Sequence, residues 1–129
     1  MSAFSDALSV TSSGLKSQAA RLRVVSENIA NVDTPGYRRK TMAFDSVSGS
    51  NGLSSVQPGD VNLSREELPD IHDPGHPLAN ANGNYKGSSV DLMIEIADAR
   101  EAQRSYEANL KMFEQTREMS SSLMDLLRR

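Results

Sequence analysis

Apolar residues recur every seven positions at both ends of the chain, and this spacing limits the folds open to it. In the first thirty residues one set of positions is Leu8, Leu15, Leu22 and Ile29. A second set, offset by four, is Phe4, Thr11, Gln18 and Val25. Two sets spaced in this way are the a and d positions of a coiled-coil seam. The N-terminal segment, residues 1–31, is therefore predicted to be one long helix that packs against other helices.

The same spacing returns in residues 90–129 and predicts a second, longer helix. One set is Leu92, Ala99, Tyr106, Phe113, Ser120 and Leu127, and its partner set is Ile96, Gln103, Leu110, Arg117 and Met124. Ser88 or Ser89 is a suitable N-cap, and Asp91 suits the first turn. The apolar character drifts to a neighbouring stripe toward the C-terminus, which indicates more than one partner helix. We expect the two helices to pair antiparallel, with the second overhanging the first.

Between the helices, residues 32–89 are rich in Gly, Ser, Asn, Asp and Pro and show no helical period. The segment Ser46–Asp60 is predicted to be a flexible loop. Two runs have the composition of short strands, Thr41–Phe44 and Val61–Leu63. A turn at Asn82-Gly83 is expected to form a small hairpin with Tyr85 and Lys86. The predicted fold class is mainly α, with two terminal helices pairing as a coiled coil and an irregular, short-β middle segment.

Composition excludes several functions. The net charge is −3, which argues against nucleic acid as a partner because phosphate binding needs a basic face. There is no Cys, so disulfides and thiolate chemistry are excluded. The hydrophobic fraction of 37% predicts a thin core that neighbours must complete. Neither a secretory leader nor an apolar run of membrane-spanning length is recognisable, so we expect no direct membrane insertion and no cleaved signal peptide.

Two histidines with nearby acids are the strongest candidates for chemistry. His72 and His76 lie among Asp70 and Asp73, a residue set that binds zinc in other proteins. Pro74-Gly75 between them prevents the helix that would place both rings on one face. We therefore expect turn and hydrogen-bonding roles, no cofactor and no enzymatic activity. A small metal hydrolase using these residues stays open as an alternative.

The segment "NIANVDTPGYRRK", from Asn28 to Lys40, ends the first helix. Asn28 and Asn31 are expected to satisfy its last carbonyls, Pro35 to stop it, and Gly36 to permit a reversal. Tyr37 is expected to lie over a neighbouring helix. The cations Arg38–Lys40 are expected to meet acids of the C-terminal helix.

Two motifs resemble signatures of the bacterial flagellar rod and hook family. The first is N-I-A-N followed by T-P-G-Y and a basic residue, which here runs from Asn28 to Arg38. The second is V-D-L-x-x-E at the head of a long helix that contains R-x-Y-E-A-N, found here at Val90–Glu95 and Arg104–Asn109. The short length resembles the proximal rod subunits, and "DPGHPLANANGNY" resembles a segment of one of them. Together the motifs identify the chain as a member of this family.

The resemblance implies a structural protein of the basal-body rod in the periplasm, which assembles helically and transmits torque. It implies contacts with itself, with other rod proteins, with the inner-membrane ring and export gate at the rod base, and with the flagellar type III export apparatus. The residues expected at assembly interfaces are Leu8, Leu15, Leu22, Asn28, Ile29, Asn31, Thr34, Pro35, Gly36, Tyr37, Arg38, Leu92, Ile96, Arg104, Tyr106, Glu107, Asn109, Leu110 and Phe113. Two alternatives stay open: another short proximal-rod subunit, and a coiled-coil export chaperone or adaptor.

Overall fold

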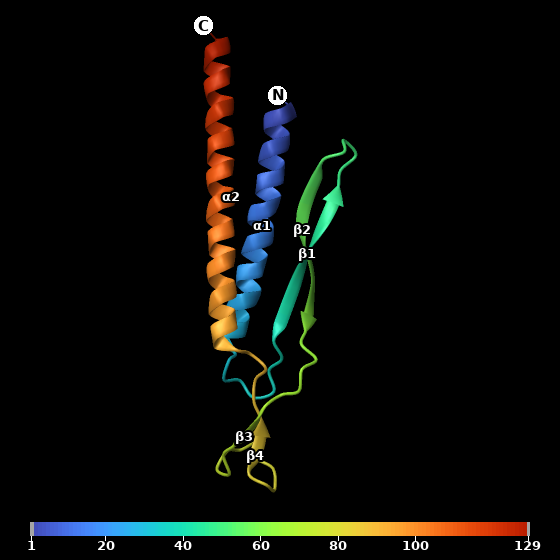
Figure 1. The fold of residues 1–129 in the computed structure, drawn as a ribbon, viewed down its shortest axis with the longest axis vertical. Helices are drawn as coiled ribbons and strands as arrows, with labels where there is room; N and C mark the ends of the chain where they lie inside the picture. The colour runs from blue at the N-terminus through green and yellow to red at the C-terminus, as the bar shows by residue number, and fades with distance from the viewer. Residues whose placement is uncertain (1, 129) are drawn as a thin grey trace.

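The computed structural model describes residues 2–128, so one end residue of each predicted range, 1–31 and 90–129, lies outside it. Within these residues the chain forms two helices, α1 (Ser2–Ala30) and α2 (Leu92–Leu127), joined through four strands. The strands are β1 (Lys40–Ser48), β2 (Ser54–Leu63), β3 (Asp70–His72) and β4 (Asn84–Lys86). Figure 1 shows a long, narrow molecule in which the helices stand beside a tall hairpin and a smaller one closes the lower end.

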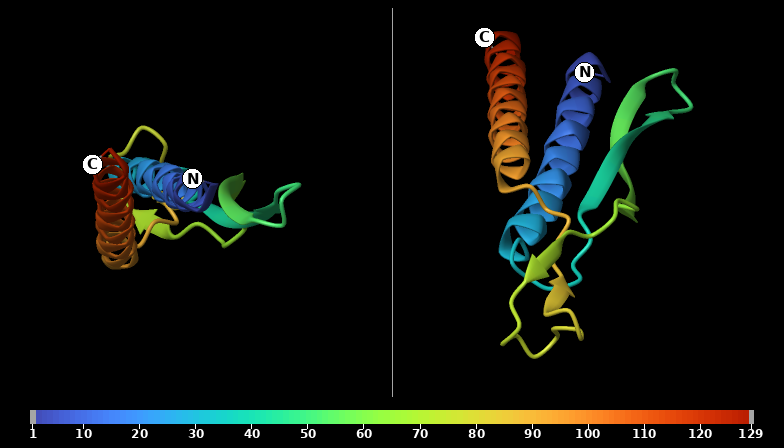
Figure 2. Two further views of the ribbon diagram at one scale, coloured as in Figure 1. Left: turned by 90° about the horizontal axis from the view of Figure 1, so that it is seen from above. Right: turned by 60° about the horizontal axis from the view of Figure 1, so that its bottom comes forward.

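The helices run antiparallel, and α1 lies between α2 and the β1–β2 hairpin (Figures 1 and 2). With 29 residues α1 spans about 44 Å, and with 36 residues α2 spans about 54 Å. The extra length of α2 extends past the beginning of α1 at the upper end. Antiparallel pairing and the overhang are thus confirmed, whereas coiled-coil packing of the two helices stays a prediction.

The closest packing of α1 on α2 uses small residues. Ser17 on α1 and Ala102 on α2 are fully buried. A Cβ added to Gly14 would lie 3.0 Å from the side-chain nitrogen of Asn109. The predicted set Leu8, Leu15, Leu22 and Ile29 is only half-buried. The buried residues of α1 are instead Ser17, Val24, Val25 and Asn28.

The β1–β2 hairpin corrects the prediction for Ser46–Asp60, which was wrong. The strands pair from Lys40 opposite Leu63 to Ser48 opposite Ser54, so the predicted strands are present but much longer. Only residues 49–53 form the turn, with Gly52 at a φ of +78°. The serine-rich composition hid this pairing, which α1 supports from one side: the Ser13 hydroxyl accepts a hydrogen bond from Val56 N at 3.2 Å.

The lower hairpin also differs from its prediction. Gly83 has a φ of +79°, as a turn at Asn82-Gly83 requires, but β4 pairs with β3 across a long loop rather than across a tight turn. His72 Nδ1 lies 2.8 Å from the side-chain oxygen of Asn84, and the ring of His76 stacks on Tyr85 with centroids 3.9 Å apart. The histidines therefore have the turn and hydrogen-bonding roles expected of them.

The start of α2 was predicted from the wrong residue. Asp91 is the N-cap, and its carboxylate accepts a hydrogen bond from Met93 N at 3.0 Å. Ser88 Oγ instead accepts from Val90 N, and Ser89 Oγ accepts from Arg39 N in another part of the chain. Asp91 is therefore the cap, and Ser89 makes a tertiary contact instead.

Candidate functional site

Polar side chains meet where α1 ends, β1 begins and α2 begins. We call this cluster the polar junction; its members are Asn28, Tyr37, Arg39, Ser89 and Glu95. Asn28 and Glu95 are almost completely buried, with 1% and 0% of their surface exposed. Buried polar groups must be hydrogen-bonded or they destabilise the fold, so the partners of these two side chains define the site.

Asn28 uses both ends of its amide. Its nitrogen donates to Lys40 O at 2.8 Å and to Glu95 Oε2 at 3.3 Å. Its oxygen accepts from the Tyr37 hydroxyl and from Lys40 N, both at 2.9 Å. Asn28 therefore ties α1 to β1 and α2, and the prediction that it satisfies the last carbonyls of its own helix was wrong. Asn31 does that, since its side-chain nitrogen donates to Glu27 O at 2.8 Å.

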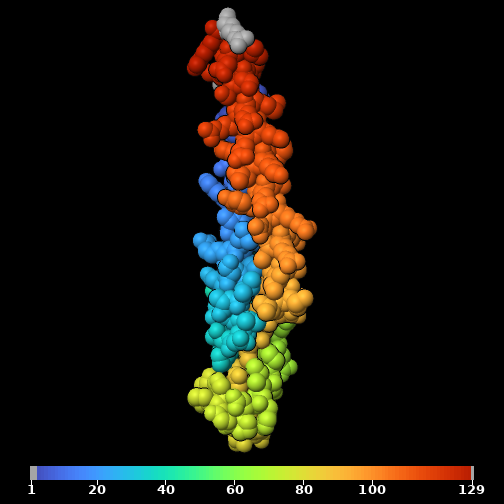
Figure 3. Space-filling model, turned by 90° about the vertical axis from the view of Figure 1, so that its left-hand side faces the viewer, coloured from blue at the N-terminus to red at the C-terminus, as the bar shows by residue number. Residues whose placement is uncertain are grey.

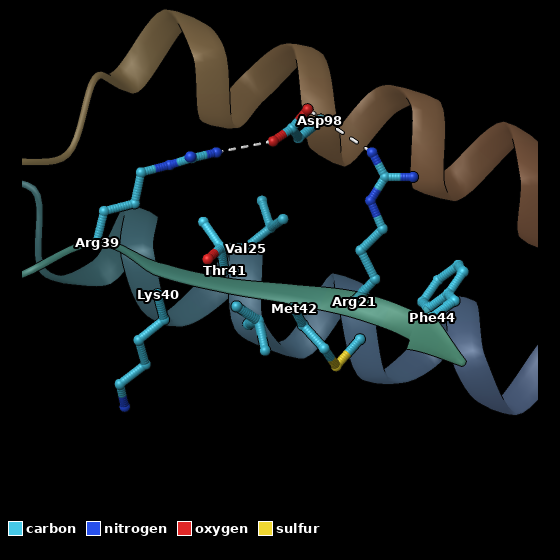
Figure 4. A pocket seen from close by; sticks show the side chains of 9 residues that line it. Arg21, Val25, Arg39, Lys40, Thr41, Met42, Phe44 and Asp98 are labelled. Atoms are coloured by element: carbon cyan, nitrogen blue, oxygen red, sulfur yellow. Dashed lines mark hydrogen bonds and ion pairs between the residues drawn. The ribbon is translucent and has the colours of Figure 1, made fainter. Parts of the chain in front are cut away.

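Arg39 carries the charge that balances the buried Glu95. Its Nε donates to Glu95 Oε1, and its Nη2 lies 3.0 Å from Asp98 Oδ2. The hydrogen bond to Glu95 raises the pKa of Arg39 above its usual range. Figure 4 shows Arg39 and Arg21 reaching Asp98 from opposite sides, across a cavity of about 280 Å³. The cations and acids at this wall are thus paired with one another.

The other two cations of the run have different partners. Arg38 donates to the backbone oxygens of Ser64 and Glu66, at 3.2 and 3.0 Å. Lys40 points away from the cavity (Figure 4) and pairs with Glu27 of α1 at 2.9 Å. The prediction that this run meets acids of the C-terminal helix therefore holds for Arg39 alone.

The turn between α1 and β1 is held by backbone bonds to the segment that precedes α2. Gly36, at a φ of +76°, donates its N–H to the oxygens of Lys86 and Gly87, both at 3.2 Å. Ser89 N donates to Tyr37 O at 3.0 Å. The reversal expected at Gly36 is confirmed. The Tyr37 hydroxyl donates to Asn28 of α1, and burial raises the pKa of this hydroxyl. The place of Tyr37 over a neighbouring helix stays a prediction.

A second region, at the opposite end, is apolar. The overhanging end of α2 and the start of α1 form a groove lined by Phe4, Gln115, Glu118, Met119, Ser122, Leu123 and Leu126. Met119 is 61% exposed and Leu126 is 64% exposed. Figure 3 shows the outer face of α2, which runs along the molecule from the lower hairpin to the upper end. This end of α2 is an apolar surface without a partner in the described part of the chain.

The remaining predicted interface residues fall into two groups. Half-buried between the elements are Tyr106, Asn109 and Phe113, while Thr34, Arg104 and Glu107 are exposed. Leu92, Ile96 and Leu110 are exposed to between 37% and 41%, and Pro35 is half-buried. The structure brings Asn28 and Tyr37 together, half-buries part of the α2 set and leaves its Leu92, Ile96 and Leu110 exposed.

Sequence reasoning expected Arg39 to meet acids of the C-terminal helix, but it missed Glu95 and Ser89 as site residues. Glu95 occupies a heptad position flanked by apolar residues, and its burial depends on Arg39, 56 positions away. One signal in the sequence could have pointed to this contact. The second family motif contains a carboxylate, Glu95, and the first contains a basic residue that could pair with it.

Within residues 2–128 no cluster of three or more His, Cys, Asp or Glu side chains is arranged to hold a metal ion. Among the same residues, no helix has the length and apolar character needed to cross a membrane.

Comparison with known proteins decides the family. A model for "Flagella basal body rod protein" matches residues 8–38, and one for "Flagellar basal body rod FlgEFG protein C-terminal" matches residues 81–126. The flagellar basal-body rod protein FlgC of Agrobacterium fabrum is 44% identical, over 99% of this chain and 98% of its own. The chain belongs to the flagellar basal-body rod family. The FlgC proteins of Bacillus subtilis and Salmonella typhimurium are 31% and 30% identical, over 98% and 91% of this chain and 99% and 92% of their own lengths.

As a FlgC-like rod protein, the chain is a structural subunit of the flagellar basal-body proximal rod and not an enzyme. The two family models cover the two regions that meet at the polar junction, since the first ends at Arg38 and the second includes Glu95. The family expected from the motifs is therefore confirmed, and the segment Asp73–Tyr85 pointed to the right subunit of the rod.

Proposed function

We propose that this rod protein assembles helically through the outer face of α2 and thereby transmits torque through the periplasm. The observation that carries the proposal is the number of large apolar side chains that α2 exposes, in residues 92–96 and 110–127. Exposed along this helix are Leu92, Met93, Ile94, Ile96, Leu110, Met112, Met119, Leu123, Met124, Leu126 and Leu127. Large contiguous apolar surfaces mark sites of association, because a lone soluble chain rarely exposes them.

The shape of the molecule supports the same proposal. The apolar groove lies at the upper end and the β3–β4 hairpin at the lower end, so the two ends present different surfaces. Contacts between unlike surfaces are heterologous, and they build open helical assemblies when the rotation between subunits does not close. A tube of such subunits would place the α1–α2 pairs side by side, with the hairpins at their flank.

Partners at the rod base follow from the family rather than from this chain's geometry. We propose contacts with other rod proteins, with the inner-membrane ring and export gate, and with the type III export apparatus. Ordering of the overhanging end of α2 would accompany assembly, since a helix with one unpartnered apolar side does not offset its conformational entropy alone. We expect the helicity of the free chain to rise when it assembles.

The test asks whether the chain is present in purified rods and whether substitutions in α2 prevent rod assembly. Basal bodies are purified from a deletion strain that carries either the parent gene or one in which Leu110→Ser and Met124→Ser are combined. We expect the parent chain in the rod and loss of rod assembly in the variant, with the variant still produced in the cell. Absence of the parent chain from purified rods would favour the export chaperone or adaptor. Normal rods with the variant would remove α2 from the interface.

The turn at Pro35-Gly36 gives a second test of this function. Replacing both residues by Ala is expected to abolish swimming while leaving expression intact, because the chain would then leave α1 at another angle. Swimming at the parent level would contradict the proposal that this turn sets the direction in which the hairpins leave the helix pair.

A further inference from the structure

The contacts between α1 and α2 follow one register. Gly14 lies against Asn109, Arg21 lies 3.4 Å from Glu101, and Asn28 donates to Glu95 at 3.3 Å. Each step of seven residues forward along α1 is matched by a step of six to eight residues back along α2. The pairing is therefore a repeating one, and a repeating seam has neighbouring registers, one heptad away, that preserve its spacing.

Most of this seam would tolerate such a slip. Ser17 and Ala102 are small, so they present no shape that fits only one position of the other helix, whereas Gly14 leaves the space that Asn109 fills. The pair Arg21–Glu101 is solvent-accessible, with 24% and 69% of the side chains exposed, and exposed pairs contribute little. The exposed pair in the middle of the seam therefore does not distinguish one register from the next.

The polar junction does make that distinction. Asn28 is the residue of α1 that hydrogen-bonds the buried Glu95, and Arg39 supplies the compensating charge. A slip by one heptad in either direction separates Asn28 from Glu95 and leaves buried polar groups without partners. Leaving a buried charge uncompensated is strongly destabilising. We infer that the Asn28–Glu95–Arg39 contact is a register lock that selects one alignment of α1 on α2.

The lock also joins the register to the course of the chain. Asn28 holds the first residue of β1 through both backbone groups of Lys40. One side chain therefore contributes both to the alignment of the helices and to the departure of the hairpin. A buried polar residue that sets helix register at some cost in stability is a known device in helix pairs.

Disulfide trapping can test this directly, because the chain has no Cys. One reporter, Gly14→Cys with Asn109→Cys, records the observed register. Two others record slips: Gly14→Cys with Ala102→Cys, and Gly14→Cys with Thr116→Cys. Both slip reporters also carry Asn109→Ala, which makes room for the thiol introduced at position 14. Disulfides are formed in the full chain while trimethylamine N-oxide is present as an osmolyte. This osmolyte strengthens the burial of apolar surface and so favours the folded state. Circular dichroism confirms helicity in every sample.

Each reporter is placed in three backgrounds. The first is the parent, the second removes the lock by Asn28→Leu, Arg39→Met and Glu95→Leu, and the third removes the exposed pair by Arg21→Met and Glu101→Leu. Without the lock we expect the ratio of slipped to in-register disulfide to rise by about tenfold or more. The third background should match the parent. An unchanged ratio in a helical chain without the lock would overturn the inference, as would an equal rise in the third background.

If the triple variant loses its helicity, the single substitution Asn28→Leu is used to test the inference. This change keeps the Arg39–Glu95 pair and removes the hydrogen bonds of Asn28 to Glu95, Tyr37 and Lys40. We expect helicity to remain and the slipped ratio to rise severalfold. A helical Asn28→Leu chain that forms only the Gly14→Cys to Asn109→Cys disulfide would show that register is set elsewhere.

Discussion

The two ends of the helix pair differ in which groups they bury and which they expose. At the lower end, buried polar groups are satisfied within the chain, and Asn28 alone makes four hydrogen bonds. At the upper end, large apolar side chains such as Leu126 stay exposed, and the described part of the chain offers no cover. The hydrogen bonds of the lower end favour one conformation of the chain. The exposed apolar side chains of the upper end favour contact with another molecule.

This contrast predicts that substitutions at the lower end change the stability of the free chain, while those at the upper end change its association. The largest effect on stability is expected from Glu95→Ala. It removes the acid that faces Arg39 and Asn28, leaving their donors without an acceptor in a buried place. We expect a loss of about 3 kcal/mol, near the low end for a broken buried pair because Arg39 keeps Asp98 and is 26% exposed.

The measurement for Glu95→Ala is urea unfolding followed by circular dichroism, and the matched control is Glu101→Ala. Glu101 lies on the same helix and pairs with Arg21, but its side chain is 69% exposed. The control should lose well under about 1 kcal/mol. Equal losses for the two variants would mean that burial of Glu95 carries no special weight.

A smaller loss is expected at the turn. Gly36→Ala should destabilise the chain by roughly 1–2 kcal/mol, because φ is +76° there and an L-residue is strained in that region. No atom lies within 4 Å of an added Cβ, so the loss reports conformation and not a clash. Gly36→Asn is the control, since Asn tolerates positive φ better than Ala. The prediction fails if both variants unfold at the same urea concentration.

The upper end should behave differently. Leu126→Ser is expected to change the unfolding free energy by less than about 0.5 kcal/mol, because the side chain is already 64% exposed. It should nevertheless impair swimming, since it removes apolar surface proposed for association. The control is Leu78→Ser, with nearly equal exposure at 63% but in the loop between β3 and β4. Swim-plate diameters compare the two, and a stronger defect from Leu78→Ser would move the main interface to the lower end.

These two regions also differ in how far the sequence predicts them. The heptads were enough to predict two long antiparallel helices with an overhang, because periodicity is a local property. Ile96, Leu110 and Met124 were predicted in the same way as seam positions, and the structure leaves all three exposed. The polar junction was out of reach, because Asn28 and Glu95 are 67 positions apart and their burial arises only when both helices are in place.

The β1–β2 hairpin shows a further limit. Its strands contain Ser, Asp, Gly and Pro, and most of their side chains are exposed, so no alternation marks them. Their pairing is supported by α1, which the composition of Ser46–Asp60 does not reveal. The hydrogen bond from Val56 N to Ser13 Oγ joins residues 43 positions apart. The local β-strand propensity of either segment does not reveal such a contact.

The smallest expected effect lies next to the polar junction and marks its outer limit. Lys40 and Glu27 pair at 2.9 Å, and this hydrogen bond lowers the pKa of Glu27 and raises the pKa of Lys40. A lowered carboxylate pKa contributes stability above its ordinary value of 4.5, and that stability is lost as the pH falls through the folded-state pKa. Both side chains are partly exposed to solvent, which screens the pair. We therefore expect Lys40→Met to leave the urea midpoint at pH 7 nearly unchanged and to remove only a slight dependence of stability on pH below 4.5.

The backbone of Lys40, which Asn28 holds, is untouched by this substitution. A large loss at pH 7 would place the Lys40 side chain inside the network and extend the polar junction to the surface of α1.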